Sequence, residues 1–216
     1  MFFIGRMVYL SLCFETSVDF VLSLVTKERI TDLINSIKNY EPYNEQEKKD
    51  KDLIIYCTEV FEDVLTRNNQ VAHFTSSAFV VNRAKDKVLM IHHNIYNSWS
   101  WIGGHADGEE NLMAVAMQEL KEETGVKNSH PVSTEIFSLD VLTVLGHLKR
   151  GSYVSPHLHL SVAYLIEADE NDLLMVKEDE NSGVKWIPID EINVYSTEPH
   201  MHKVYEKLIS KLNSFK

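Results

Sequence analysis

The residues best suited to chemistry are concentrated in one stretch, residues 103–126, which reads GGHADGEENLMAVAMQELKEETGV. Glu119, Glu122 and Glu123 stand at positions i, i+3 and i+4, so on a helix their carboxylates share one face. Like charges at this spacing repel one another unless a cation lies among them. Carboxylate oxygens are preferred ligands of Mg²⁺, which often bridges to substrate phosphates. The spacing therefore predicts a divalent-metal site for phosphoryl chemistry.

The same stretch can place these carboxylates beside a cleft. The glutamate face lies about a quarter turn from an apolar stripe on the predicted helix, and so at the edge of its buried surface. Gly103 and Gly104 precede the helix, and glycine lets the backbone approach a bound ion closely. Gly125 suits the helix end. The apolar stripe consists of Leu112, Met113, Ala116, Met117 and Leu120.

This stretch resembles the Nudix box, G-x5-E-x7-R-E-U-x-E-E-x-G-U, in which U is a bulky aliphatic residue. The resemblance covers roughly residues 73–195 and implies an α+β fold, an α/β/α sandwich with a mixed β-sheet. It also implies hydrolysis of a nucleoside diphosphate linked to another moiety. Eight of the nine constrained positions match: Gly104, Glu110, Glu119, Leu120, Glu122, Glu123, Gly125 and Val126.

The resemblance assigns roles to the acidic residues by position. Glu119, Glu122 and Glu123 would be ligands of Mg²⁺ or Mn²⁺, and the carbonyl of Gly104 would complete part of the coordination shell. Glu119 or Glu122 would act as the catalytic base toward water. A bound metal lowers the pKa of its water and neutralises the pyrophosphate.

A further metal ligand in this family often comes from a loop ahead of a W-x-P strand. Glu180 lies six residues before Trp186 in such a segment, EDENSGVKWIPI, and is the expected ligand. Glu178 is the alternative.

Gln118 stands where the box has arginine, and this is the one departure from the pattern. Glutamine can donate hydrogen bonds but supplies no positive charge. A metal ion would then have to neutralise more of the carboxylate charge, so we expect weaker or more metal-dependent activity than a complete box would give.

Other polar residues are candidates for substrate contacts. His157 and His159 share one face of a predicted strand, where they would contact substrate, bind zinc as a pair or simply face the solvent. His105 directly follows the two glycines. The five candidates are His105, Lys149, Arg150, His157 and His159.

Hydrophobic periodicity divides the chain into two parts. Helical spacing over residues 18–40 and 53–65 predicts a helical N-terminal extension, residues 1–70. Residues 71–216 then form the hydrolase domain, with a C-terminal helix over 199–216. The expected strands are Thr75–Val81, Lys87–His93 (joined to the first as a hairpin), Tyr96–Ile102, Ile136–Leu148, Val154–Ile166 and Val184–Ile189.

Composition narrows the class of protein. The 216 residues carry a formal net charge of -11, which argues against a nucleic-acid polymer as partner. Two cysteines, Cys13 and Cys57, are too few for a disulfide framework and indicate a reducing compartment, so we expect the cytoplasm. Residues 1–26 are apolar, but Glu15 and Asp19 interrupt them, so we expect neither a signal peptide nor a membrane segment.

Two rival functions follow from the same fold. An isoprenoid diphosphate isomerase would need a cysteine near the box, and neither cysteine is placed for it. A non-catalytic ligand-binding or regulatory module is favoured by Gln118 and disfavoured by the intact glutamates. The N-terminal extension would either cover the substrate pocket or form a homodimer interface, and the substrate would be a small diphosphate compound.

Overall fold

A mixed, curled β-sheet is the centre of the fold in the computed structural model, which describes residues 30–149 and 151–214. The main strand order is β10-β2-β1-β9-β5; β3 pairs with β2, β4 with β1 and β6 with β9. The strands are β1 (Ala72–Val81), β2 (Lys87–His93), β3 (Ser98–Ser100), β4 (Ile102–His105), β5 (Ser129–Pro131), β6 (Ser138–Val144), β9 (His157–Ala168) and β10 (Asn181–Pro188).

Strands β1 and β9 run parallel to each other in the middle of the sheet, whereas the remaining pairs are antiparallel. Every residue of β1 is buried, so helices must cover both of its faces. Alternate residues enter two cores: Phe74 and Val80 face one, and Phe79 and Val81 face the other.

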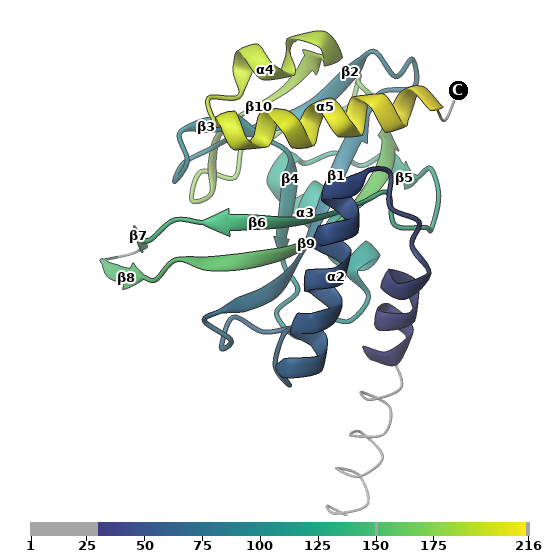
Figure 1. The fold of residues 1–216 in the computed structure, drawn as a ribbon. Helices are drawn as coiled ribbons and strands as arrows, with labels where there is room; N and C mark the ends of the chain where they lie inside the picture. The colour runs from purple at the N-terminus through teal and green to yellow at the C-terminus, as the bar shows by residue number, and fades with distance from the viewer. Residues whose placement is uncertain (1–29, 150, 215–216) are drawn as a thin grey trace, which may run out of the picture.

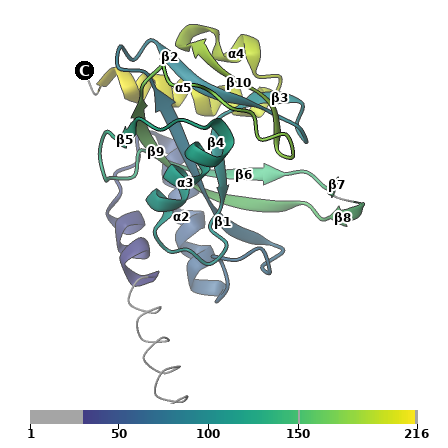
Figure 2. The ribbon, with the colours of Figure 1, turned by 180° about the vertical axis from the view of Figure 1, so that it is seen from behind.

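Helices supply the two outer layers. Helix α5 (Pro199–Ser214) lies across one face of the sheet in Figure 1, and α3 (Leu112–Thr124) lies on the other face, seen from behind in Figure 2. The short η1 (Ile189–Glu191) and α4 (Ile192–Tyr195) lead into α5. The predicted α+β sandwich with a mixed sheet is confirmed.

The N-terminal region packs on this body through a helix over residues 30–39 and α2 (Glu45–Val60). Asn44 caps α2 by accepting a hydrogen bond from the amide of Glu47. Helix α2 ends at Val60, before the end of the helical spacing predicted over residues 53–65, because Phe61 takes an extended conformation. The expectations for residues 1–29 lie outside the described residues.

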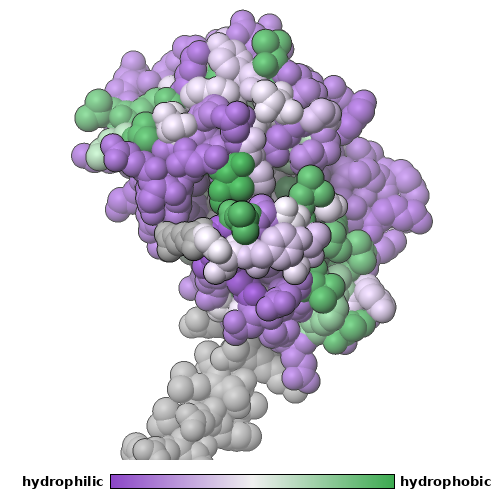
Figure 3. All heavy atoms as spheres, turned by 90° about the vertical axis from the view of Figure 1, so that its left-hand side faces the viewer, coloured by the Kyte–Doolittle hydropathy of each residue, from purple (hydrophilic) through white to green (hydrophobic). Residues whose placement is uncertain are grey.

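The two long strands predicted over 136–148 and 154–166 are each interrupted. Leu145 and Gly146 separate β6 from β7 (His147–Lys149), and Pro156, which lacks a backbone donor, separates β8 (Ser152–Val154) from β9. The β7–β8 hairpin projects sideways from the sheet (Figure 1). Figure 3 views this side, where hydrophobic residues interrupt a hydrophilic surface. Leu148 and Tyr153 of the hairpin are among the exposed large hydrophobic residues.

Within the described ranges no helix combines the length and the hydrophobicity needed to cross a membrane.

Candidate metal centre and the adjoining pocket

Three carboxylates converge where α3 meets the start of β10. Glu119 and Glu123 lie one turn apart on α3, and Glu180 comes from the loop before β10. One oxygen from each lies within 4.8 Å of the others. Glu180 is held there by its backbone carbonyl, which accepts from the amide of Asn94 at 3.0 Å.

Burial and mutual repulsion raise the pKa values of two carboxylates in this cluster. Burial, and then the neighbouring Glu119, raise the pKa of Glu123 to about 8. Burial and the charge of Glu180 likewise raise the pKa of Glu119. Both shifts have the same cause, since burial and neighbouring carboxylates disfavour the charged form and a positive charge at the cluster would relieve them.

Both glycines before the helix are fitted to these side chains. A Cβ on Gly104 would lie 2.0 Å from Oε1 of Glu119, so only glycine leaves room for that carboxylate in this position. The amide of Gly103 donates to Oε2 of Glu123 at 3.3 Å. Gly125, with φ of 72°, ends α3 in the left-handed conformation, as its position after the helix predicted.

Glu122 lies apart from the three converging carboxylates. Its side chain is exposed and accepts a hydrogen bond from Gln118 at 2.7 Å. Lys177 lies 3.3 Å from Glu122 and 3.0 Å from Glu180, so its ammonium bridges the helix and the loop. Lys177 thus brings a positive charge to the side of the cluster where the box arginine is missing.

A pocket of about 540 Å³ opens beside β4, β9 and the β7–β8 hairpin. Four predicted substrate contacts line it: His105, Lys149, His157 and His159. Arg150 lies outside the described residues. Arg67 and His93 also line the pocket, and Arg67 forms a two-pronged ion pair with Asp107, with Nε 2.7 Å from Oδ1.

The pocket and the carboxylates are neighbours across β4. Successive residues of a strand face opposite sides of the sheet, so Gly104 faces Glu119 while His105 faces the pocket. Asp107 acts electrostatically on both His105 and Glu119, and Glu180 acts on His93 in the pocket wall. The pocket and the carboxylates therefore lie on opposite faces of β4, and each is within electrostatic reach of the other.

Histidines dominate one wall of the pocket. Burial, and then the nearby charge of Arg67, lower the pKa of His105 to about 3. Burial and the neighbouring His105 lower the pKa of His159 to about 2. The pKa of the buried His73 is lowered mainly by desolvation. These imidazoles are neutral at physiological pH and can act as ligands or hydrogen-bond partners.

Two residues near the site, His73 and Lys177, were not predicted from the sequence. His73 lies on β1 in register with His159 on β9, a relation that only strand pairing reveals. Lys177 lies in an acidic loop that offered no periodic pattern. The available signal for Lys177 was its position three residues before Glu180.

Residues 72–208 match the family model for the NUDIX domain. Similar solved structures include an Ap4A hydrolase of C. elegans in a binary complex (16% identity, 66% of this chain and 96% of that chain, TM-score 0.45). A NUDIX-family hydrolase of Clostridium perfringens gives 21% identity, 65% and 97% coverage and a TM-score of 0.46. The Nudix hydrolase RenU of M. smegmatis is 12% identical, with 67% of this chain and 88% of that chain covered and a TM-score of 0.47. A search of curated proteins found no significant match.

Proposed function

The chain belongs to the Nudix family, and on that premise we propose that it hydrolyses a diphosphate linkage in a nucleoside diphosphate derivative or a related compound. The observation that carries the proposal is the convergence of Glu119, Glu123 and Glu180 beside Gly104. Enzymes of this family generally use divalent metals.

The residues at the carboxylate cluster fit a hard divalent cation, because every donor there is oxygen. We propose Mg²⁺ or Mn²⁺, held by Glu119, Glu123, Glu180 and the carbonyl of Gly104. Glu122, the remaining predicted ligand, stays in the proposal by its position in the box. When bound, such an ion lowers the pKa of a coordinated water and neutralises phosphate charge.

Glu119 is the stronger candidate for the base that receives a proton from the attacking water. Its carboxylate lies in the cluster, where burial and the charge of Glu180 raise its pKa in the absence of metal. The second candidate base, Glu122, lies outside the cluster, where its contacts with Gln118 and Lys177 suit it to orienting Lys177. We expect Gln118 to make activity weaker or more metal-dependent than a complete box would, with the ammonium of Lys177 replacing part of the missing guanidinium charge.

The pocket is the proposed substrate site. Arg67 and Lys149 offer positive charge for phosphates, and His105, His157 and His159 offer imidazole contacts. Arg150 stays in the proposal by its sequence position alone.

A metal-dependent turnover screen tests the function. Nucleotide sugars, dinucleoside polyphosphates and nucleoside triphosphates are incubated with the full chain and Mg²⁺ or Mn²⁺, and phosphate products are quantified. We expect at least one class to be cleaved, and cleavage to stop when EDTA removes the metal. If no substrate class is cleaved with either metal, the result would favour a non-catalytic ligand-binding module instead.

The remaining assignments are parts of the same proposal. We place the boundary of the N-terminal extension at residue 70 and the hydrolase domain at 71–216, in a cytoplasmic protein with a small-molecule diphosphate substrate. Leu53, Tyr56 and Val60 expose apolar surface at i, i+3 and i+7 of α2. This stripe supports a homodimer through the extension.

Gly104→Ala is expected to weaken Mn²⁺ binding with little loss of stability. The added Cβ overlaps the flexible end of Glu119 and would push its carboxylate out of the cluster. Because supporting groups around a metal contribute roughly 10–100-fold to affinity, we expect a loss of that order by isothermal titration calorimetry. Glu135→Ala serves as the control, since Glu135 is exposed and lies outside the cluster. Equal affinities for the two variants would contradict the role of Gly104.

The metal-free protein is expected to lose stability as pH rises toward about 8. Glu123 has its pKa raised from 4.5 to about 8 in the folded state, so the folded chain binds the proton more tightly than the unfolded chain. Its stabilising contribution is complete below about pH 4.5 and disappears as pH rises through about 8. Urea unfolding in EDTA from pH 5 to 9 measures this, and Glu123→Gln should flatten the decline. Mn²⁺ affinity should rise over the same window, because the metal displaces this proton.

A further inference from the structure

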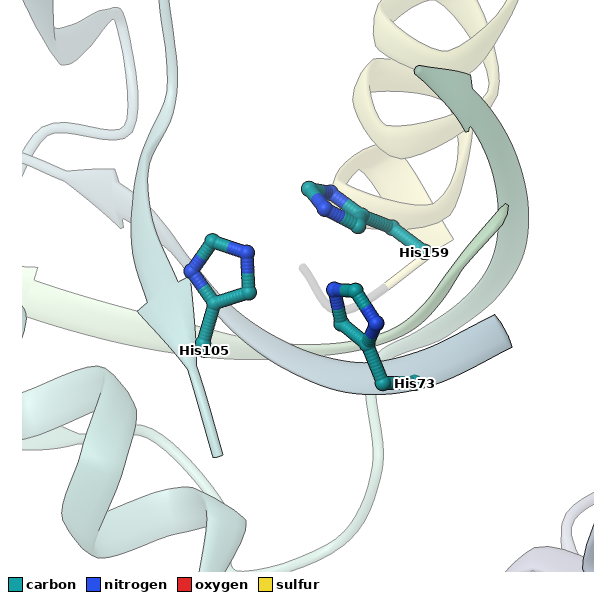
Figure 4. Close-up of side chains that lie close together, drawn as sticks. All are labelled: His73, His105 and His159. Atoms are coloured by element: carbon teal, nitrogen blue, oxygen red, sulfur yellow. The ribbon is translucent and has the colours of Figure 1, made fainter. Parts of the chain in front are cut away.

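His73, His105 and His159 converge from three strands (Figure 4). All three line the pocket, and none belongs to the carboxylate cluster. His73 on β1 is in register with His159 on β9, and His105 on β4 lies opposite Thr75, two residues along β1. Residues at this spacing share a face of the sheet. One ring nitrogen from each lies within 4.8 Å of the others.

The orientation of His73 identifies its free nitrogen. Its Nδ1 lies 2.8 Å from the backbone carbonyl of Asn69, which can only accept, so Nδ1 carries the proton. Its Nε2 is buried and has no hydrogen-bond partner. A histidine ligand of zinc is commonly fixed in this way, with one nitrogen donating to a carbonyl and the other directed at the metal.

We infer that His73, His105 and His159 form a second metal site, one that binds a borderline-soft divalent cation such as Zn²⁺ and is distinct from the carboxylate site. Three histidines with a fourth position left open are a known catalytic zinc arrangement. Zn–N bonds of about 2.0–2.1 Å place ligand nitrogens about 3.3 Å apart in a tetrahedron, so small rotations of the rings close the site. The open position faces the pocket that all three residues line.

The two sites differ in chemistry, and so each selects its own ion. Imidazole nitrogens suit zinc, whereas an all-carboxylate site suits magnesium or manganese. His157 supports the arrangement from outside: its Nδ1 donates to the carbonyl of Ser155 at 2.8 Å, and its Nε2 lies 3.2 Å from Nε2 of His159. When Nε2 of His157 accepts a hydrogen bond from Nε2 of His159, the lone pair of His159 lies on its Nδ1.

The test measures bound metal and requires no substrate. The full chain is stripped with a chelator and dialysed against Zn²⁺ in a large excess of Mg²⁺, and zinc per chain is measured by elemental analysis. Co²⁺ replaces Zn²⁺ in a parallel sample, whose visible spectrum reports tetrahedral nitrogen ligation. We expect one zinc per chain and a tetrahedral cobalt spectrum.

Variants locate the ion. Loss of a hydrogen bond to a metal ligand lowers metal affinity by roughly 10–100-fold. His105→Gln and His159→Gln each remove a ligand itself, so each should lower zinc affinity by more than that. His130→Gln, an exposed histidine on β5, and Glu119→Gln should retain it. Three results would each overturn the inference. The unaltered chain could bind no zinc, both histidine variants could retain zinc, or zinc could be lost only from Glu119→Gln. None of these results depends on whether the protein hydrolyses a diphosphate.

Discussion

Glu119→Gln is expected to lower kcat for diphosphate hydrolysis by about 10²–10⁴-fold, the range associated with loss of a general base. The amide cannot take a proton from water and contributes less charge to a divalent cation. Because glutamine has nearly the same shape, the room beside Gly104 is preserved and the fold should be unaffected. Steady-state kinetics at saturating Mn²⁺, together with Mn²⁺ titration, separate the loss of the base from loss of metal affinity.

Two further glutamate variants make this result specific. Glu135→Gln removes an exposed carboxylate outside the cluster and should leave kcat within about twofold, as expected for a surface change. Glu122→Gln should cost less than Glu119→Gln, because the Glu122 carboxylate lies beside Gln118 and Lys177. A loss for Glu122→Gln as large as that for Glu119→Gln would show that the base had been assigned to the wrong glutamate.

Lys207→Met is expected to reduce the free energy of unfolding by about 3–5 kcal/mol, the cost of breaking a buried ion pair by removing one partner. Lys207 on α5 is buried, and its Nζ lies 2.6 Å from Asp140 on β6 and 3.2 Å from Glu47 on α2. The substitution would leave two buried carboxylates to share Lys211, which lies 2.9 Å from Glu47. Chemical denaturation measures the change.

Lys203→Met is the matched control for this prediction. Lys203 lies one turn earlier on α5, with its side chain 87% exposed and an ion pair to Glu206 at 3.5 Å. Exposed pairs of this kind contribute about 0–1 kcal/mol, so the control should lose less than about 1 kcal/mol. Similar losses for the two variants would mean that the buried cluster does not hold the N-terminal and C-terminal helices to the sheet.

The stability prediction also bears on the N-terminal extension. Glu47 accepts hydrogen bonds from Tyr40, Ser138 and Lys211, which connects α2 to both β6 and α5. The chain between residues 30 and 60 is therefore built into the body of the protein by charge pairing as well as by apolar contacts. Periodicity predicted its helices, but the sequence contains no local signal that pairs Glu47 with residues about 160 positions away.

Local patterns in the sequence were sufficient for much of the fold. The apolar stripe and Gly125 defined α3, because helix periodicity and a left-handed end are properties of neighbouring residues. Short β-branched runs located β1 and β2, which do pair antiparallel across the predicted turn. Strand ends were less well predicted, since Pro156 and Gly146 interrupt runs that are otherwise continuous in hydrophobicity.

The sequence by itself determined that Glu119 and Glu123 share a helix face, because their spacing and the helical repeat are enough to place them together. Only the tertiary structure decided which carboxylates meet. Glu180 was already the expected ligand from its position before the W-x-P strand, but the structure left Glu122 beside Lys177 and set His73 next to His159. Each of these relations depends on strand register and loop path. Both are fixed by packing among residues far apart in the chain, and no local pattern encodes them.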